Sequence, residues 1–213
     1  MVGADFGQAH YYIKLLRGDG DHPVHWQMFN DKDSESGSPQ VFYSSLNDAK
    51  ATIEQYQKQG FGAYITINPT DGKGRKRENI TAFKWLFADI DGNKQVLVDY
   101  PLKPAFITSR DGTHGHVYWP ITGITTEKQY NRAQRLISMY LECDEQVIDP
   151  CRVARCPGTF HLKDPANPAS YKVVQDNSDV VDFEYDYEEV LEAFKLDDEK
   201  QKVVEKFITN REA

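Results

Sequence analysis

Two aspartates at the end of an apolar stretch have the residue type and spacing that could do chemistry. Asp89 and Asp91 close the stretch that begins at Phe83, and Gly92 follows them. The stretch has strand composition, and residues i and i+2 of a strand point to the same face. Neighbouring carboxylates repel each other, and a hard cation such as Mg²⁺ removes that repulsion. The pattern therefore predicts a metal site, although a solvated turn at a strand end would look the same.

A glycine-containing hairpin supplies a second group of candidates. Its two strands are expected at about 105–109 and 115–119, which would bring Ser109 and His116 near one another. A hydroxyl and an imidazole, backed by turn N–H groups, suit a triphosphate. The alternative is that His116 is a structural residue on an aromatic strand.

Cations gather in two parts of the sequence, one before and one after the two aspartates. Arg152, Arg155 and Lys163 lie around a Pro-Gly turn, where they could hold polyphosphate beside a metal site or form ordinary surface ion pairs. The densest basic patch is in the polar loop 68–79, which could contact nucleic-acid phosphates or be an exposed hairpin tip; it holds Lys73, Arg75, Lys76 and Arg77.

The elements that must position these residues are predicted from hydrophobic periodicity and turn signals. Short apolar runs predict strands at 24–29, 41–43 and 62–67, and helical spacing predicts helices at 47–59 and 127–140. The start of the chain is expected to be frayed over residues 1–8, with a short helix or a strand at 10–16. From Val180 the chain becomes acidic, with Asp182 among its carboxylates, and we expect a solvated tail or linker with helices at 186–195 and 197–209.

Composition limits the class of protein. The 213 residues are 39% hydrophobic and 12% aromatic, which supports a packed core. The net charge of −8 differs from that of a strongly basic nucleic-acid-binding protein, although basic residues can cluster locally. The chain shows no transmembrane run and no signal-peptide pattern, and its three cysteines, an odd number, are expected to be free thiols in a reducing cytoplasm, bacterial or phage-infected.

Three blocks, in this order, resemble the archaeo-eukaryotic primase (AEP) superfamily, most closely the primase-polymerase domains of phages and plasmids. They are the Asp-x-Asp of Asp89 and Asp91, the Ser and His of TSRDGTHGHVYW, and Ile148-Asp149 followed by RVARCPGTFHLK. The resemblance covers about residues 20–175. It implies an α+β fold in which an RRM-like mixed sheet forms the catalytic core, beside a smaller N-terminal αβ subdomain. The catalytic domain would span 1–180 and the acidic helical tail 181–213.

The resemblance also implies roles for the candidate residues. Asp89, Asp91 and Asp149 would bind Mg²⁺ or Mn²⁺, and Asp149 is preferred to Asp144 because Ile148-Asp149 matches the family's hydrophobe-Asp pattern. The incoming nucleotide would contact Ser109 and His116, while the phosphates or template would contact Arg152, Arg155 and Lys163. His161 stands where relatives often have Asn.

The activity that the resemblance implies is two-metal nucleotidyl transfer. The protein would make or extend primers from dNTPs or NTPs on a single-stranded DNA template, in phage, plasmid or other mobile-element replication, with a helicase as a possible partner.

Two alternatives belong to other classes of protein. A relaxase or rolling-circle nickase would use the pair His114 and His116 for a metal and Tyr130 as its nucleophile. A nucleic-acid-binding module of similar topology would stack bases on Tyr118 and Trp119.

Overall fold

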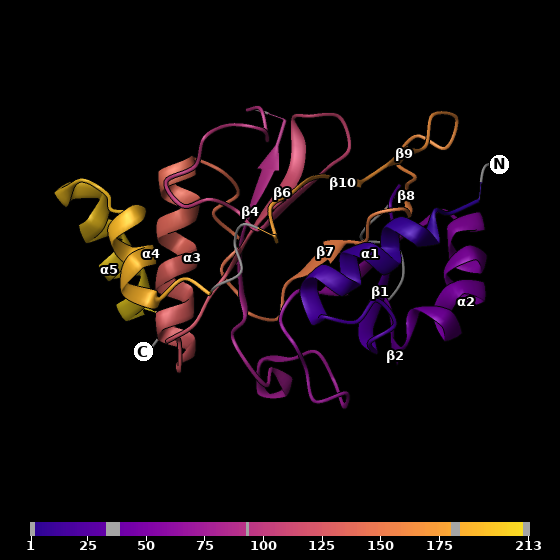
Figure 1. Ribbon diagram of the computed structural model, residues 1–213, viewed down its shortest axis with the longest axis horizontal. Coiled ribbons are helices and arrows are strands. Elements are labelled where there is room, and N and C mark those ends of the chain that lie inside the picture. Colours follow the sequence, from indigo (N-terminus) through magenta and orange to yellow (C-terminus); the bar gives the residue numbers. More distant parts are fainter. Residues whose placement is uncertain (1–2, 33–38, 93, 180–183, 211–213) are drawn as a thin grey trace. The chain divides into compact units, whose positions relative to one another are not determined.

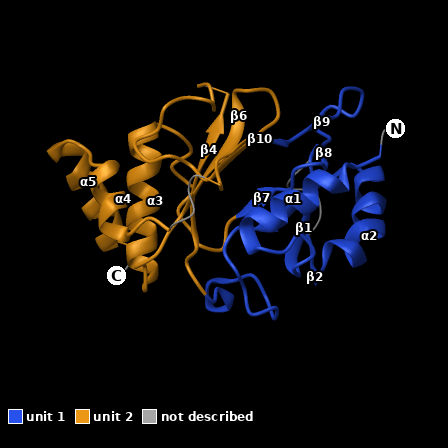
Figure 2. Cartoon of the chain, viewed as in Figure 1, with its two compact units in different colours: residues 1–81, 153–173 blue, residues 82–152, 174–213 orange. Residues whose placement is uncertain are grey.

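The structure, a computed structural model, describes residues 3–32, 39–92, 94–179 and 184–210. These fall into two compact units: residues 1–81 with 153–173 form unit 1, and residues 82–152 with 174–213 form unit 2 (Figure 2). The N-terminal subdomain that the sequence predicts is therefore completed by a segment from much later in the chain. That segment includes Arg155 and Lys163, which the sequence had grouped with the catalytic core.

Unit 1 is built around an antiparallel sheet of order β2-β1-β3-β7. Its elements are α1 (Phe6–Arg17), β1 (Val24–Asn30), β2 (Gln40–Ser44), α2 (Leu46–Lys58), β3 (Phe61–Thr66), the 3₁₀ turn η1 (Arg77–Asn79), β7 (Val153–Arg155), β8 (Phe160–His161) and β9 (Ala169–Ser170). Trp26, Met28 and Ile65 of the sheet are fully buried, as is Tyr12 of α1. The three N-terminal strands and α2 confirm the periodicity-based predictions.

Helix α1 begins earlier than the sequence suggested. The Asp5 side chain accepts hydrogen bonds from the N–H groups of Gly7 and Gln8, and this N-cap starts the helix at Phe6. At the other end Gly18 adopts a left-handed conformation with φ of 82°. The expectation of a frayed start is thus wrong for residues 3–8, and a helix rather than a strand occupies residues 10–16.

Unit 2 contains the sheet that carries the two aspartates, with strand order β10-β5-β6-β4. Its elements are β4 (Trp85–Asp91), β5 (Phe106–Ser109), β6 (His114–Pro120), α3 (Glu127–Leu141), β10 (Lys172–Asp176), α4 (Tyr187–Ala193) and α5 (Asp198–Asn210) (Figure 1). The first two residues of β10 are counted with unit 1. Strands β4 and β5 both pair antiparallel with β6. The predicted α+β class is confirmed, and each strand pair whose register is given among the described residues is antiparallel.

One buried amide joins α3 to β4. The Gln134 side chain donates to the carbonyl oxygens of Phe87 (3.0 Å) and Val147 (2.9 Å), and its own oxygen accepts the Phe87 N–H at 2.9 Å. It therefore satisfies backbone groups of β4 that are turned away from β6, and fixes the segment after α3 to the same strand. This contact sets the position of β4 two residues before Asp89.

The C-terminal helices pack rather than extend into solvent. Both α4 and α5 lie against α3 (Figure 1). Val190, Phe194, Val204 and Ile208 are buried. The helices of the expected tail are therefore present, but residues 184–210 form part of unit 2. They do so because the apolar faces of α4 and α5 pack against α3. Val180 and Asp182, where the acidic stretch begins, lie outside the described residues, and a domain boundary at residue 180 stays a prediction.

Two further expectations concern cysteines and membranes. Cys143, Cys151 and Cys156 are free thiols, as predicted. Among the helices that the structure describes, none is long and apolar enough to cross a membrane.

Gly115 lets β6 approach β5 closely. A Cβ at this position would lie 2.2 Å from the Thr108 carbonyl oxygen and 3.2 Å from the Ser109 Cα, both of which are backbone atoms. Gly115→Ala is therefore expected to lower the free energy of unfolding by about 3 kcal/mol, at the upper end for overpacking. Urea unfolding measures the loss. Gly3→Ala is the matched control, because nothing lies within 4 Å of its Cβ. Equal midpoints for the two variants would contradict the prediction.

Candidate active site

The two aspartates lie on one face of β4, opposite two histidines of β6. Asp89 is the cross-strand partner of His116, and Asp91 is the partner of His114. The Asp89 Oδ1 is 3.5 Å from His116 Nε2, and the Asp91 Oδ1 is 3.6 Å from His114 Nε2. The predicted side-by-side projection of the aspartates is therefore confirmed, and the register adds an imidazole opposite each one.

The hairpin places Thr108, not Ser109, beside His116. Thr108 is the cross-strand partner of His116, and its hydroxyl lies 3.4 Å from His116 Nδ1. Ser109 pairs with Gly115 and therefore points to the other face. Its hydroxyl donates to the His114 carbonyl (2.8 Å) and accepts the Gly112 N–H (2.9 Å). The expected proximity of Ser109 and His116 side chains is wrong by one residue, and the Ser109 hydroxyl closes the turn.

Asp89 lies where a negative charge is unfavourable. Its side chain keeps 35% of its exposure, whereas the neighbouring His116 side chain keeps only 9%. Desolvation raises the pKa of Asp89, and the charges of Asp144 and Asp91 raise it further, against the opposing effects of His116 and Arg152. A cation placed among these carboxylates would relieve the repulsion.

Asp89→Asn is expected to stabilise the metal-free protein at pH 7. The folded-state pKa of Asp89 is raised, so its charge weakens the fold above the unfolded pKa of about 3.9 and has no effect well below it. Solvent screens a side chain that is 35% exposed, so we expect a gain near the lower end of about 0.5–2 kcal/mol. Thermal unfolding in EDTA should show a larger Tm difference at pH 7 than at pH 4. An equal difference at both would contradict the assignment.

The segment that follows α3 brings a further carboxylate toward Asp89. Glu142 ends the helix in a left-handed conformation, and the Asp144 N–H then donates to the Asp89 carbonyl at 3.4 Å. Asp149, the sequence-predicted third ligand, is half-buried, and its carbonyl accepts the Arg152 N–H at 3.2 Å. This hydrogen bond joins the main chains of Asp144 and Asp89, and the charge of Asp144 is one of those that raise the pKa of Asp89.

These residues suit a hard cation without forming a complete cage. In the described part of the chain, no group of three or more His, Cys, Asp or Glu side chains is already arranged to hold a metal ion. Mg²⁺ is usually bound through one or two carboxylates together with water and substrate phosphates. Asp89, with its raised pKa, and the neighbouring Asp91 fit that kind of open site.

Arg155 occupies a buried ion pair within unit 1. Its guanidinium donates to both carboxylate oxygens of Asp31, at 2.8 and 3.1 Å, and it also bonds the Tyr64 hydroxyl. The two side chains of the pair are only 7% and 2% exposed. Asp31 also accepts the Leu162 N–H at 2.7 Å. These contacts give Arg155 a structural role in unit 1. Its contact with a nucleotide stays a prediction.

The other predicted cations of unit 1 lie on its surface. Lys163 is exposed. In the basic loop, Asp71 accepts hydrogen bonds from the Asn79 amide and the Lys73 N–H, so the loop is held by its own polar side chains. Lys73, Lys76 and Arg77 are exposed and Arg75 is half-buried. Their contact with nucleic acid stays a prediction.

Burial weakens both alternative interpretations. Tyr130, the nucleophile of the nickase interpretation, is fully buried, and its hydroxyl donates to the Trp85 carbonyl. Tyr118 and Trp119, the base-stacking residues of the binding-module interpretation, are also fully buried. Tyr118 stacks on Phe106 instead, with ring centroids 4.3 Å apart.

Known proteins match this chain in structure but not in sequence. No protein-family model matches the sequence, and no curated protein matches it. Solved structures do match. The AEP domain of the cyanophage S-2L primase-polymerase aligns with a TM-score of 0.66 at 19% identity, over 91% of this chain and 100% of that one.

Two structures of the primase RepB′ are also similar. One aligns with a TM-score of 0.63 at 11% identity, over 97% of this chain and 68% of that chain. The other, the catalytic domain in complex with initiator DNA, gives 0.61 at 12% identity, over 92% and 97%. The chain therefore has the fold of an AEP domain, as its motifs predicted.

Proposed function

We propose that this protein is a DNA-dependent primase-polymerase that transfers nucleotides onto a primer terminus on a single-stranded DNA template. The observation that carries the proposal is that Asp89 and Asp91 lie side by side on one face of β4, at the end of that strand. The strand belongs to a chain with the fold of an AEP domain. A surface made of carboxylates opposite imidazoles suits divalent cations and the phosphates they bind.

The carboxylates would hold Mg²⁺ or Mn²⁺, and such ions lower the pKa of an attacking hydroxyl and neutralise charge on the departing pyrophosphate. Asp89 and Asp91 are two of the proposed ligands. The third comes from the segment after α3, and the link of Asp144 to Asp89 makes Asp144 a candidate beside Asp149. Comparing Asp144→Ala with Asp149→Ala for Mn²⁺ affinity would separate them.

Other residues would bind the nucleotide and the nucleic acid. His116 lies beside Asp89, and the Thr108 hydroxyl lies on the other side of its ring. From this position His116 would contact the incoming triphosphate. Arg152 acts on Asp89 electrostatically and would stabilise negative charge in the same place. Ser109 would act by holding the turn of the hairpin. Lys163 and the basic loop would contact backbone phosphates, because exposed cations suit sequence-independent binding.

Binding to DNA has additional support from one relative, RepB′, which is described in complex with initiator DNA. We extend this to a single-stranded template with dNTPs or NTPs as substrates. Replication of a phage, a plasmid or another mobile element is the proposed setting, and a helicase is the proposed partner.

A synthesis assay tests the proposal. The protein is incubated with a single-stranded template, labelled dNTPs or NTPs and Mg²⁺ or Mn²⁺, with and without a primer. Products without a primer establish a primase, and extension of a primer alone establishes a polymerase. Covalent attachment of DNA to the protein without synthesis would support the nickase, and metal-independent binding without synthesis would support the binding module.

A further inference from the structure

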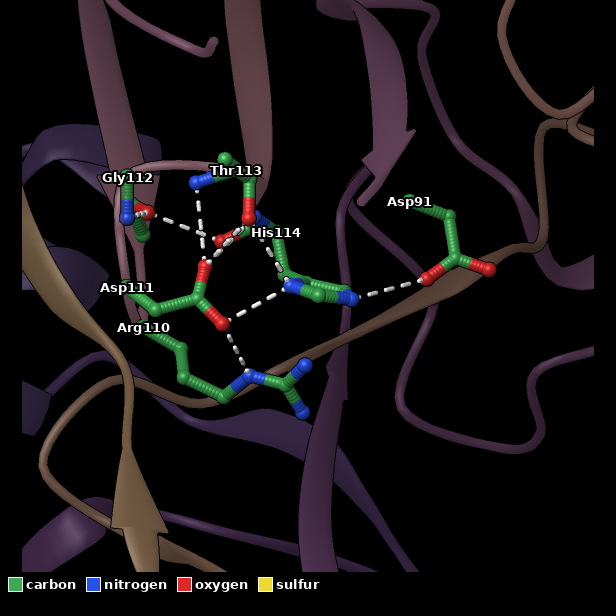
Figure 3. Close-up of polar contacts among 7 residues, drawn as sticks. Asp91, Arg110, Asp111, Gly112, Thr113 and His114 are labelled. Carbon is green, nitrogen blue, oxygen red and sulfur yellow. Dashed lines mark hydrogen bonds and ion pairs between the residues drawn. The ribbon is translucent and has the colours of Figure 1, made fainter. Parts of the chain in front are cut away.

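His114 belongs to a row of polar side chains that begins at the hairpin turn and ends at Asp91. The Arg110 Nε is 3.1 Å from Asp111 Oδ2, and the same oxygen is 2.8 Å from His114 Nδ1 (Figure 3). On the other side of the ring, Nε2 lies 3.6 Å from Asp91 Oδ1. Asp111 and Asp91 therefore lie on opposite sides of one imidazole.

Asp111 is held as a charged acceptor by its own turn. Its Oδ1 accepts the N–H groups of Thr113 (3.0 Å) and His114 (2.8 Å), together with the Thr113 hydroxyl. Burial acts to raise the pKa of Asp111, but these hydrogen bonds and that from Arg110 outweigh it and leave the pKa well below its usual value. The carboxylate is thus a fixed acceptor for the imidazole.

A charged carboxylate can only accept, so the His114 nitrogen that faces Asp111 must carry a proton. That leaves Nε2 directed toward Asp91. Histidines that bind metals almost always donate their other ring N–H to a carboxylate or carbonyl in this way, which fixes the tautomer and the ring orientation. The row therefore has the arrangement of a metal-binding histidine with its supporting carboxylate.

The spacing and the free volume at Nε2 agree with this. Nitrogen and oxygen ligands at about 2.0–2.2 Å from one ion lie about 3.0–3.4 Å apart, close to the 3.6 Å between His114 Nε2 and Asp91 Oδ1. Gly92 keeps the space beside Nε2 open, because a Cβ there would lie 2.8 Å from that nitrogen. Asp91 itself is 84% exposed and can move toward a shared ion.

We propose that His114 and Asp91 together bind one of the divalent cations of the site, with Asp111 fixing the His114 ring for that role. This rests on the proposed function for the presence of a cation at Asp91, and it adds a nitrogen ligand to what the motifs predict. Water and substrate phosphates complete the coordination. Mg²⁺ is a hard cation that takes oxygen ligands, whereas Mn²⁺ belongs to the transition-metal series and accepts a nitrogen ligand more readily, so His114 should favour Mn²⁺ over Mg²⁺.

Metal binding without nucleotide or DNA tests the proposal apart from activity. Mn²⁺ affinity is measured by electron paramagnetic resonance, and Mg²⁺ affinity by competition. His114→Ala and His114→Gln are expected to weaken Mn²⁺ binding about 10-fold or more while changing Mg²⁺ binding much less. His22→Ala is the matched control, since His22 is exposed and lies in unit 1.

Asp111→Asn supplies an independent measurement. With the Asn oxygen keeping the backbone hydrogen bonds, its NH₂ group would face Nδ1, and the imidazole proton would move to Nε2, which can then no longer bind a metal. We expect a loss of Mn²⁺ affinity similar to that of His114→Ala. The nitrogen-15 shifts of the His114 ring should show the change of tautomer, and thermal unfolding shows whether the variant is folded.

The outcomes separate this inference from the proposed function. If wild-type protein binds Mn²⁺ and synthesises DNA but His114→Ala keeps the same Mn²⁺ and Mg²⁺ affinities, His114 forms only an ion pair and the inference fails alone. If His114→Ala raises the KM for nucleotide without changing metal affinity, the residue contacts the triphosphate and the inference again fails. If wild-type protein binds no divalent cation, both proposals fail.

Discussion

Replacing Asp89 and Asp91 together with alanine is expected to reduce nucleotide incorporation by at least about 10³-fold. The two side chains are the cross-strand partners of His116 and His114. Removing both takes away two of the proposed metal ligands, and losing one major electrostatic stabiliser of a transition state already costs about 10²–10³-fold. Incorporation of labelled nucleotide on a primed template, in Mg²⁺ and in Mn²⁺, measures the loss.

The fold should survive this double substitution. Asp91 is largely exposed, and the Asp89 charge weakens the metal-free protein. The thermal midpoint should therefore stay at or above that of wild type. Asp99→Ala is the control, because it removes an exposed carboxylate from the same unit. Synthesis that persists in the folded double variant would show that these aspartates do not hold the catalytic cations.

Arg155→Ala is expected to destabilise the protein by about 3–5 kcal/mol. The substitution leaves the Asp31 carboxylate buried, at 2% exposure, without the cation that makes two hydrogen bonds to it. Breaking a buried pair costs more than the pair contributes, because the remaining charge has no solvent to stabilise it. The variant also loses the stacking of the guanidinium on Tyr64, 4.4 Å from the ring centroid.

Urea unfolding of three variants tests this explanation. Asp31→Ala should be destabilised to a similar extent, and the double variant Arg155→Met/Asp31→Leu should recover part of the loss because it buries no unpaired charge. Lys163→Ala, which changes an exposed cation of the same unit, should unfold at the wild-type midpoint. An Arg155→Ala protein of wild-type stability but weaker nucleotide binding would instead restore the nucleotide-contact role that the sequence predicts.

The sequence predicts best what depends on local periodicity. The alternation of β4 fixes Asp89 and Asp91 on one face whatever the rest of the chain does, and the apolar spacing of α3 is visible directly in its residues. The capping box at Thr126 and Gln129 is equally local. These predictions need only the geometry of one element.

Contacts between elements were harder to predict. The hairpin residue beside His116 depends on the pairing register, and a shift of one position exchanges Ser109 for Thr108. Gln134 is a polar residue of the kind usually found on the surface. It is buried because its side chain forms hydrogen bonds with backbone groups of β4. An arginine in the RxxRxPGT motif suggests a contact with phosphate, whereas Arg155 forms an ion pair with Asp31, 124 residues earlier in the chain. No local pattern encodes such distant partners.

The C-terminal helices show a similar effect of tertiary packing. Their many acidic residues suggested solvated chain, yet the apolar residues between them bury against α3. Phe194 reaches the Trp119 ring, with centroids 5.5 Å apart. The acidic residues indicate only that one face of these helices is exposed, and the packing of the other face depends on the apolar residues between them.

The most direct test of the account is to locate the metal. Crystals of the protein with a nonhydrolysable nucleotide and Mn²⁺ should give anomalous scattering peaks beside the Asp89 and Asp91 carboxylates, with the triphosphate next to His116. Peaks at that position would support the site, and one within coordination distance of His114 Nε2 would support the further inference. Mn²⁺ bound elsewhere, with the nucleotide away from β4, would contradict the central claim that these aspartates form the nucleotidyl-transfer site.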